Sequence, residues 1–130
     1  NVLELLDKSP SKTQRRIGRV LTGHKFVGRA LAANGFIVVI PDYRLYPEVR
    51  YPTFLADSAA AVAFGIDQAQ RLGGNPRRVF VVGHSAGAYN AAMLALDPRW
   101  LAGAHRRPAE LAGWVGLAGP YDFLPIRTPK

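Results

Sequence analysis

The chain has 130 residues, 48% of them apolar, which is the composition of a single globular domain. It contains no cysteine, which excludes disulfides and thiolate metal sites, and no apolar run approaches the ~20 residues that a membrane span requires. The net charge of +8 is carried by basic pairs scattered through apparent loops with few aromatic residues between them, which argues against nucleic-acid binding.

The first residues show no regular pattern. We expect residues 1–22 to form an irregular N-terminal segment and residues 23–130 to form one domain. Glu4 and Asp7, near the start, are not typical of a secretory signal peptide, which favours a cytoplasmic location.

From Lys25 onward the sequence is regular. The segment KFVGRALAANG places apolar residues on one face of a helix, and Asn34 and Gly35 at its end are typical of a helix stop. The next residues, 36–40, form the unbroken apolar and mainly β-branched run FIVVI. Such a run predicts a strand buried on both faces, as in a parallel sheet covered by helices.

Two further helices and two further strands are predicted. The second helix begins near Pro52 and ends before the Gly-Gly-Asn-Pro sequence at 73–76. It carries an apolar stripe that comprises Leu55, Ala59, Val62, Ile66 and Ala69. A buried strand at 79–82, a largely apolar helix at 88–96 and a short strand at 114–118 follow. This alternation predicts an α/β fold, specifically a three-layer α/β/α sandwich with a parallel central sheet.

The strongest functional signal is the sequence GHSAG, between the second strand and the third helix. A nucleophile on a tight strand-to-helix turn needs small neighbours, and Gly83 and Gly87 provide them. With His84 completing the turn, this geometry exposes the hydroxyl of Ser85 and points the N–H of Ala86 toward an oxyanion. The alternative is a structural turn in a Rossmann-like sheet, but nucleotide binding there requires the pattern Gly-x-Gly-x-x-Gly.

Three segments resemble one family: FVGRALAANGFIVVIPDYRLYPE, GGNPRRVFVVGHSAGAYNAAMLAL and GLAGPYDFLP. Together, over about residues 25–126, they are similar to the α/β-hydrolase superfamily, in its esterase/lipase branch of hormone-sensitive-lipase-like and feruloyl-esterase-like enzymes. The resemblance implies that Ser85 is the acyl-accepting nucleophile and that the Ala86 N–H is half of an oxyanion hole. It implies no metal or organic cofactor, and it assigns residues 42–44 to a structural loop below the active site.

The chain departs from this family at the partners of the serine. The family's His-Gly-Gly-Gly oxyanion run is missing, and His24, the only histidine in that region, is not expected to replace it. In this fold the triad acid and the histidine follow the serine along the chain. After Ser85 the acidic residues are Asp97, Glu110 and Asp122, and the only histidine is His105. Asp97 is typical of a helix stop, and His105 follows in a basic loop. The side chain of His84 should point away from the serine hydroxyl. We therefore expect that this chain lacks the triad acid and base.

The predicted sheet is also smaller than the sheets of this family, because only three strands are evident. The simplest interpretation is a central slice of a longer enzyme. A serine without a base is a weak nucleophile at neutral pH, so we expect little turnover from this polypeptide alone.

The predicted function is hydrolysis of a small-molecule carboxylic ester through an acyl-enzyme on Ser85, without nucleic-acid or membrane partners. One alternative is an amide hydrolase of the arylformamidase or peptidase type, since the same turn serves all of these enzymes. The other is a catalytically inactive module with this fold that acts by binding. The sequence does not predict the oligomeric state or the acyl and alcohol groups of the substrate.

Overall fold

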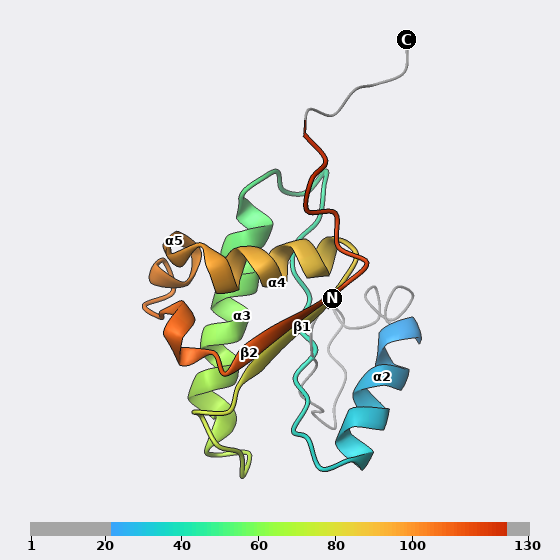
Figure 1. Cartoon of the computed structure of the whole chain (residues 1–130), viewed down its shortest axis with the longest axis vertical. Helices are drawn as coiled ribbons and strands as arrows, with labels where there is room; N and C mark the ends of the chain where they lie inside the picture. Colours follow the sequence, from blue (N-terminus) through green and yellow to red (C-terminus); the bar gives the residue numbers. More distant parts are fainter. Residues whose placement is uncertain (1–21, 125–130) are drawn as a thin grey trace.

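The computed structural model describes residues 22–124 of the chain (Figure 1). In chain order they form α2 (Thr22–Ala33), α3 (Thr53–Ala69), β1 (Phe80–His84), α4 (Ala86–Leu96), α5 (Pro98–Ala102), the 3-10 helix η1 (Pro108–Glu110) and β2 (Gly113–Leu117). The combination of helices with a parallel sheet confirms the predicted α/β fold class. Residues 1–21, most of the segment predicted to be irregular, lie outside the described residues.

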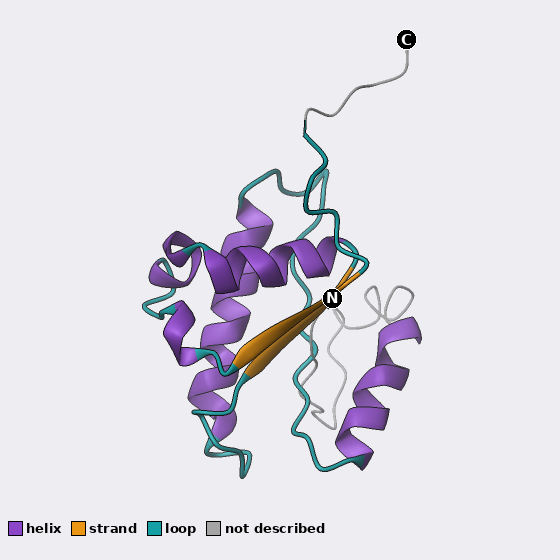
Figure 2. Ribbon diagram, viewed as in Figure 1, coloured by secondary structure: helices purple, strands orange, loops and turns teal. Residues whose placement is uncertain are grey.

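The sheet of the described residues consists of β1 and β2, which run parallel and side by side (Figure 2). Phe80 lies opposite Gly113, and His84 lies opposite Leu117. Between the two strands the chain passes through α4, α5 and η1, which is the helical crossover that a parallel pair requires. Both strands were predicted within two residues of their observed ends.

The predicted strand at 36–40 is not formed. Within this segment only Ile40 makes an isolated bridge, and no described residue provides a hydrogen-bonding ladder, without which an extended run is not part of a sheet. Phe36 and Ile37 are exposed rather than buried on both faces. The segment instead packs on α2, where a Cβ at Gly28 would lie only 2.7 Å from Cδ1 of Ile40.

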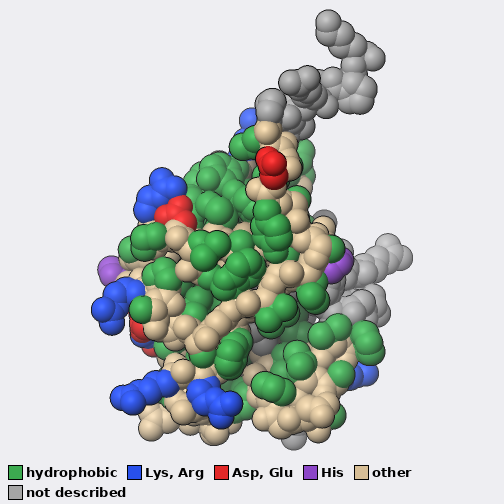
Figure 3. Space-filling model, in the orientation of Figure 1, with side chains coloured by type: hydrophobic (Ala, Val, Ile, Leu, Met, Phe, Trp, Pro, Cys, Tyr) green, Lys and Arg blue, Asp and Glu red, His purple; other side chains and the backbone are tan. Residues whose placement is uncertain are grey.

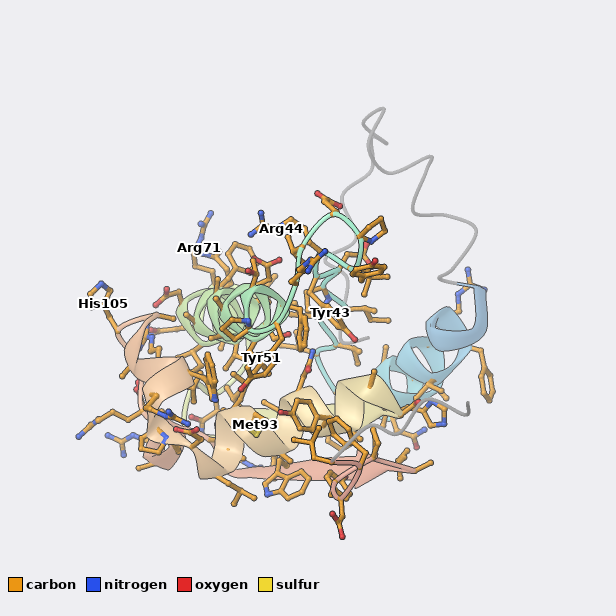
Figure 4. The ribbon with its side chains drawn as sticks, turned by 90° about the horizontal axis from the view of Figure 1, so that it is seen from above. Tyr43, Arg44, Tyr51, Arg71, Met93 and His105 are labelled. Carbon is orange, nitrogen blue, oxygen red and sulfur yellow. The ribbon has the colours of Figure 1, made fainter. Side chains whose placement is uncertain are left out.

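The hydrophobic core lies on one face of the strands. Figure 4 shows β2, α4 and α3 as successive layers. The buried residues of α3 are those of the predicted stripe: Leu55, Ala59, Val62, Ile66 and Ala69. Three of them, Ala59, Val62 and Ile66, form a central cluster with residues of the strand and the next two helices: Val81 of β1, Ala91 and Leu94 of α4, and Leu101 of α5. Asn90 of α4 is also buried, and its side-chain amide donates a 3.2 Å hydrogen bond to the hydroxyl of Ser58 on α3.

The opposite face of the strands is apolar and open. Side chains alternate along a strand, so the inward direction of Val81 places Phe80 and Val82 on the other face. The register adds Val115 and Leu117 to them. Figure 3 shows hydrophobic side chains gathered over the strands on this face. Phe80, Val115 and Leu117 are each exposed, so nothing among residues 22–124 covers them fully.

Leu94 and Leu96 provide a matched test of this core, because both belong to α4 but are 1% and 70% exposed. We expect Leu94→Ala to lower the free energy of unfolding by about 2–4 kcal/mol, through lost burial and the cavity that remains. Leu96→Ala should change it by less than about 0.5 kcal/mol. Urea unfolding followed by circular dichroism measures both, and equal effects would contradict the assignment of the core.

Candidate active site

The turn at Ser85 joins β1 directly to α4. β1 ends at His84 and α4 begins at Ala86, so one residue makes the whole connection (Figure 1). Ser85 has φ 55° and ψ −121°, a conformation that a residue with a Cβ rarely adopts. Such backbone strain persists only where the surrounding structure enforces it, and it is typical of functional sites.

Gly83 explains why the turn can be so tight. A Cβ on Gly83 would overlap the carbonyl oxygen of Gly87 and lie 2.6 Å from the nitrogen of Ala88. These are backbone atoms of the first turn of α4, which cannot move aside as a side-chain end could. The spacing of the two glycines therefore reflects direct contact between the end of β1 and the beginning of α4.

The backbone of Ser85 is held on both sides. Its N–H donates a 2.9 Å hydrogen bond to the carbonyl of Leu117, at the end of β2, and its carbonyl accepts 2.9 Å and 3.3 Å bonds from the N–H groups of Ala88 and Tyr89. The Ser85 side chain makes no capping bond to the helix, and both Ser85 and Ala86 are exposed. The helix leaves the N–H of Ala86, in its first turn, without an intrahelical acceptor.

His84 lies on the other side of the sheet from α4. Side-chain alternation places Val81 and Gly83 toward the helices and His84 toward the open face, beside Leu117. This arrangement agrees with the expectation that its imidazole points away from the hydroxyl of Ser85.

Two candidate partners of the serine, Asp97 and His105, lie away from the turn. Asp97 follows the 11 residues of α4, which places it ~18 Å from Ser85 at the helical rise. Its carboxylate caps α5 and binds the Arg99 guanidinium at 2.6 Å, and this hydrogen bonding lowers the pKa of Asp97. His105 is exposed in the loop before η1, and Figure 4 shows it far from the first turn of α4. His24 belongs to α2, which comes before the β1–α4 turn in the sequence.

Residues 42–44 belong to a loop that is fastened to α3. The guanidinium of Arg44 donates hydrogen bonds of 2.9 Å and 2.7 Å to the two carboxylate oxygens of Asp57, and the Arg44 N–H adds a third at 3.1 Å. The side-chain hydrogen bond from Arg44 lowers the pKa of Asp57, and burial raises the pKa of Tyr43. These contacts hold the loop in place and agree with a structural role for it.

Two aromatic residues near the turn were not singled out from the sequence. Tyr89 lies one helical turn after Ser85, and its ring meets the ring of Phe123 edge to face, with centroids 5.5 Å apart. Burial raises the pKa of Tyr89, and the charge and side-chain hydrogen bond of Tyr51 raise it further. The sequence indicates only that Phe123 follows the last strand and so lies near the sheet edge where parallel strands end; it does not indicate the contact with Tyr89.

Other features of the described residues do not belong to this turn. A hollow of about 540 Å³ lies near the opposite end of the strands, lined by residues that include Pro76, Arg77, Arg106 and Glu110. Among residues 22–124 no three metal-ligating side chains come together. The helices there are all too short or too polar to cross a membrane.

Comparison with known proteins identifies a family. A family model described as the α/β hydrolase fold matches residues 16–120. Lipase 2 of Moraxella sp. (strain TA144) is 42% identical over 79 residues, which are 61% of this chain and 18% of the relative. Carboxylesterase NlhH of Mycobacterium tuberculosis (strain ATCC 25618 / H37Rv) is 45% identical over 76 residues, which are 58% of this chain and 24% of the relative.

Esterase LipC of the same Mycobacterium tuberculosis strain matches a longer part of the chain. It is 30% identical over 116 residues, which are 86% of this chain and 28% of the relative. The chain thus spans between 18% and 28% of the length of these three relatives. No solved structure matches the chain at a comparable level.

Gly83 and Gly65 allow a matched test of the turn, because a Cβ at Gly65 would meet nothing within 4 Å. We expect Gly83→Ala to lower the free energy of unfolding by about 3 kcal/mol, since backbone atoms must separate. Gly65→Ala, inside α3, should raise it by about 0.5–1 kcal/mol. Chemical denaturation measures both changes, and a neutral Gly83→Ala would show that β1 and α4 do not meet as described.

The Arg44–Asp57 pair should make stability depend on pH in the acid range. The pKa of Asp57 is lowered in the folded protein, so the pair contributes fully above the carboxyl's unfolded pKa and is lost as pH falls through the folded pKa. Asp57→Asn should therefore destabilise the protein at neutral pH, and the difference from the native chain should disappear in strong acid. Unfolding curves at a series of pH values measure the difference in stability between the two chains. A difference that grows on acidification would contradict the lowered pKa of Asp57.

Proposed function

The chain belongs to the α/β-hydrolase fold family, and we propose that its Ser85 is the nucleophile of a carboxylic-ester hydrolase. The observation that carries the proposal is the backbone of Ser85, held at φ 55° between a strand and a helix with its side chain exposed. A serine that only shaped a turn would not need this conformation, since glycine adopts it at lower cost.

In the proposed reaction, Oγ of Ser85 attacks the carbonyl carbon of the ester while a general base removes its proton. The carbonyl oxygen becomes an oxyanion, which the N–H of Ala86 and the positive end of α4 stabilise. The bond to the alcohol oxygen then breaks, and the alcohol leaves with the proton. Water hydrolyses the acyl-serine by the same steps, which releases the acid and restores the hydroxyl.

We propose that the acid and the histidine of the triad lie outside residues 22–124. Both follow the serine along the chain in this fold. His105, the histidine that follows Ser85 among residues 22–124, lies far from the turn and faces solvent (Figure 4). Asp97 is distant from the turn, and Glu110 is bound by Arg106 and Arg107. Asp122 is exposed in the loop after β2, but an acid acts in a triad only through a histidine. The low coverage of the relatives supports a longer parent enzyme, of which this chain would be the central part. The isolated chain should accordingly turn over esters slowly.

The relatives favour an ester over an amide as substrate. Those three proteins are named as a lipase, a carboxylesterase and an esterase. An inactive binding module would retain the fold, so the reactivity of Ser85 separates it from an enzyme.

Labelling with a fluorophosphonate tests the nucleophile. We expect slow modification of the chain, acceleration by added imidazole acting as an external base, and an adduct located on Ser85 by mass spectrometry. Ser85→Ala should abolish the label, whereas His105→Ala, on an exposed loop, should leave its rate unchanged. An adduct at another residue, or none at any imidazole concentration, would favour the binding module.

A further inference from the structure

The loop that follows β2, residues 118–124, is fixed beside the turn at Ser85 (Figure 1). The hydrogen bond from the Ser85 N–H to the Leu117 carbonyl ties the end of β2 to the turn, and the chain then bends at Ala118, where φ is 50°. A Cβ on Gly116 would overlap the Tyr121 hydroxyl, and one on Gly119 would lie 2.7 Å from Cε1 of the same ring. The Tyr121 side chain thus lies over both glycines and anchors the loop.

Tyr89 brings a second aromatic ring to the same place. Long side chains on a helix point back over the preceding turn, and the turn preceding Tyr89 is the one that begins at Ser85. Its backbone N–H bonds to the Ser85 carbonyl at 3.3 Å, which fixes this relation. The ring of Tyr89 packs edge to face against Phe123, at an interplanar angle of 74°. Helix and loop are therefore joined by an aromatic contact next to the nucleophile.

The loop side of this contact is open to solvent. Phe123 is 42% exposed, and Tyr121 and Leu124 on either side of it are more so. Three large apolar side chains on one short loop cost free energy in water unless something covers them. Their place at the edge of the sheet where Ser85 stands makes them continuous with the proposed site.

We propose that Tyr89 and Phe123 form an aromatic binding surface for an aromatic acyl or alcohol group of the ester that Ser85 attacks. This inference rests on the proposed function, because the ligand is a substrate only if Ser85 attacks esters. A planar ring fits this surface because it can pack edge to face on the exposed part of Phe123, as Tyr89 does on the other part. A short alkyl group has neither the area nor the quadrupole for that contact. Phe123 and Tyr89 thereby determine specificity and do not take part in the chemistry.

The test measures the binding of phenyl acetate to the full chain with the substitution Ser85→Ala, which removes the nucleophile and so prevents reaction. Amide chemical shifts in NMR report the binding. We expect shifts at Tyr89 and in residues 118–124, and an affinity about fivefold higher than for ethyl acetate. Phe123→Ala should weaken phenyl acetate about fivefold and leave ethyl acetate nearly unchanged. Phe64→Ala removes a phenylalanine of α3 that is 45% exposed, similar to Phe123, and should have no effect.

The outcomes separate the two proposals. Any of three results would overturn the inference. Phenyl acetate could bind the Phe123→Ala and parent chains with equal affinity, its chemical-shift changes could be confined to the open sheet face around Phe80, or it could fail to bind up to its solubility. If the fluorophosphonate fails to label Ser85 while phenyl acetate binds as expected, the proposed function fails and the aromatic surface remains as a ligand site. Tyr89→Leu provides a second variant, which keeps apolar volume in α4 but removes the ring.

Discussion

The contact between Gly83 and Gly87 is the constraint on which the site depends. Because no side chain separates these backbones, the last residues of β1 and the first turn of α4 meet directly. Ser85 is thereby left with a positive φ between them, and its N–H reaches the carbonyl of Leu117 on the neighbouring strand. One steric condition thus sets the position of the serine, the start of the helix and the link to β2.

Local patterns in the sequence predicted most of the elements. The stripe on α3 lies where the period of 3.6 residues requires, and GHSAG predicted the strand–turn–helix arrangement because its two glycines act on adjacent backbone. The prediction of a strand at 36–40 was wrong because a strand depends on a partner that hydrogen-bonds to it. The composition of one segment contains no information about that partner.

The aromatic pair at the turn could not be derived in the same way. Tyr89 and Phe123 are 34 positions apart, and they meet because the carboxyl ends of β1 and β2 share an edge and the loop after β2 bends back at Ala118. Neither residue has an unusual sequence context: Tyr89 interrupts an apolar helix, and Phe123 follows a turn. By contrast, the separation of Asp97 from Ser85 followed from the length of α4 alone.

The open apolar face over Phe80, Val115 and Leu117 has a consequence for handling the isolated chain. Molecules carrying a net charge of +8 repel one another, and at low ionic strength that repulsion opposes the burial of such faces against each other. Added salt shortens the range of the repulsion and leaves the hydrophobic attraction in place. We therefore expect self-association of the isolated chain to increase as salt is added.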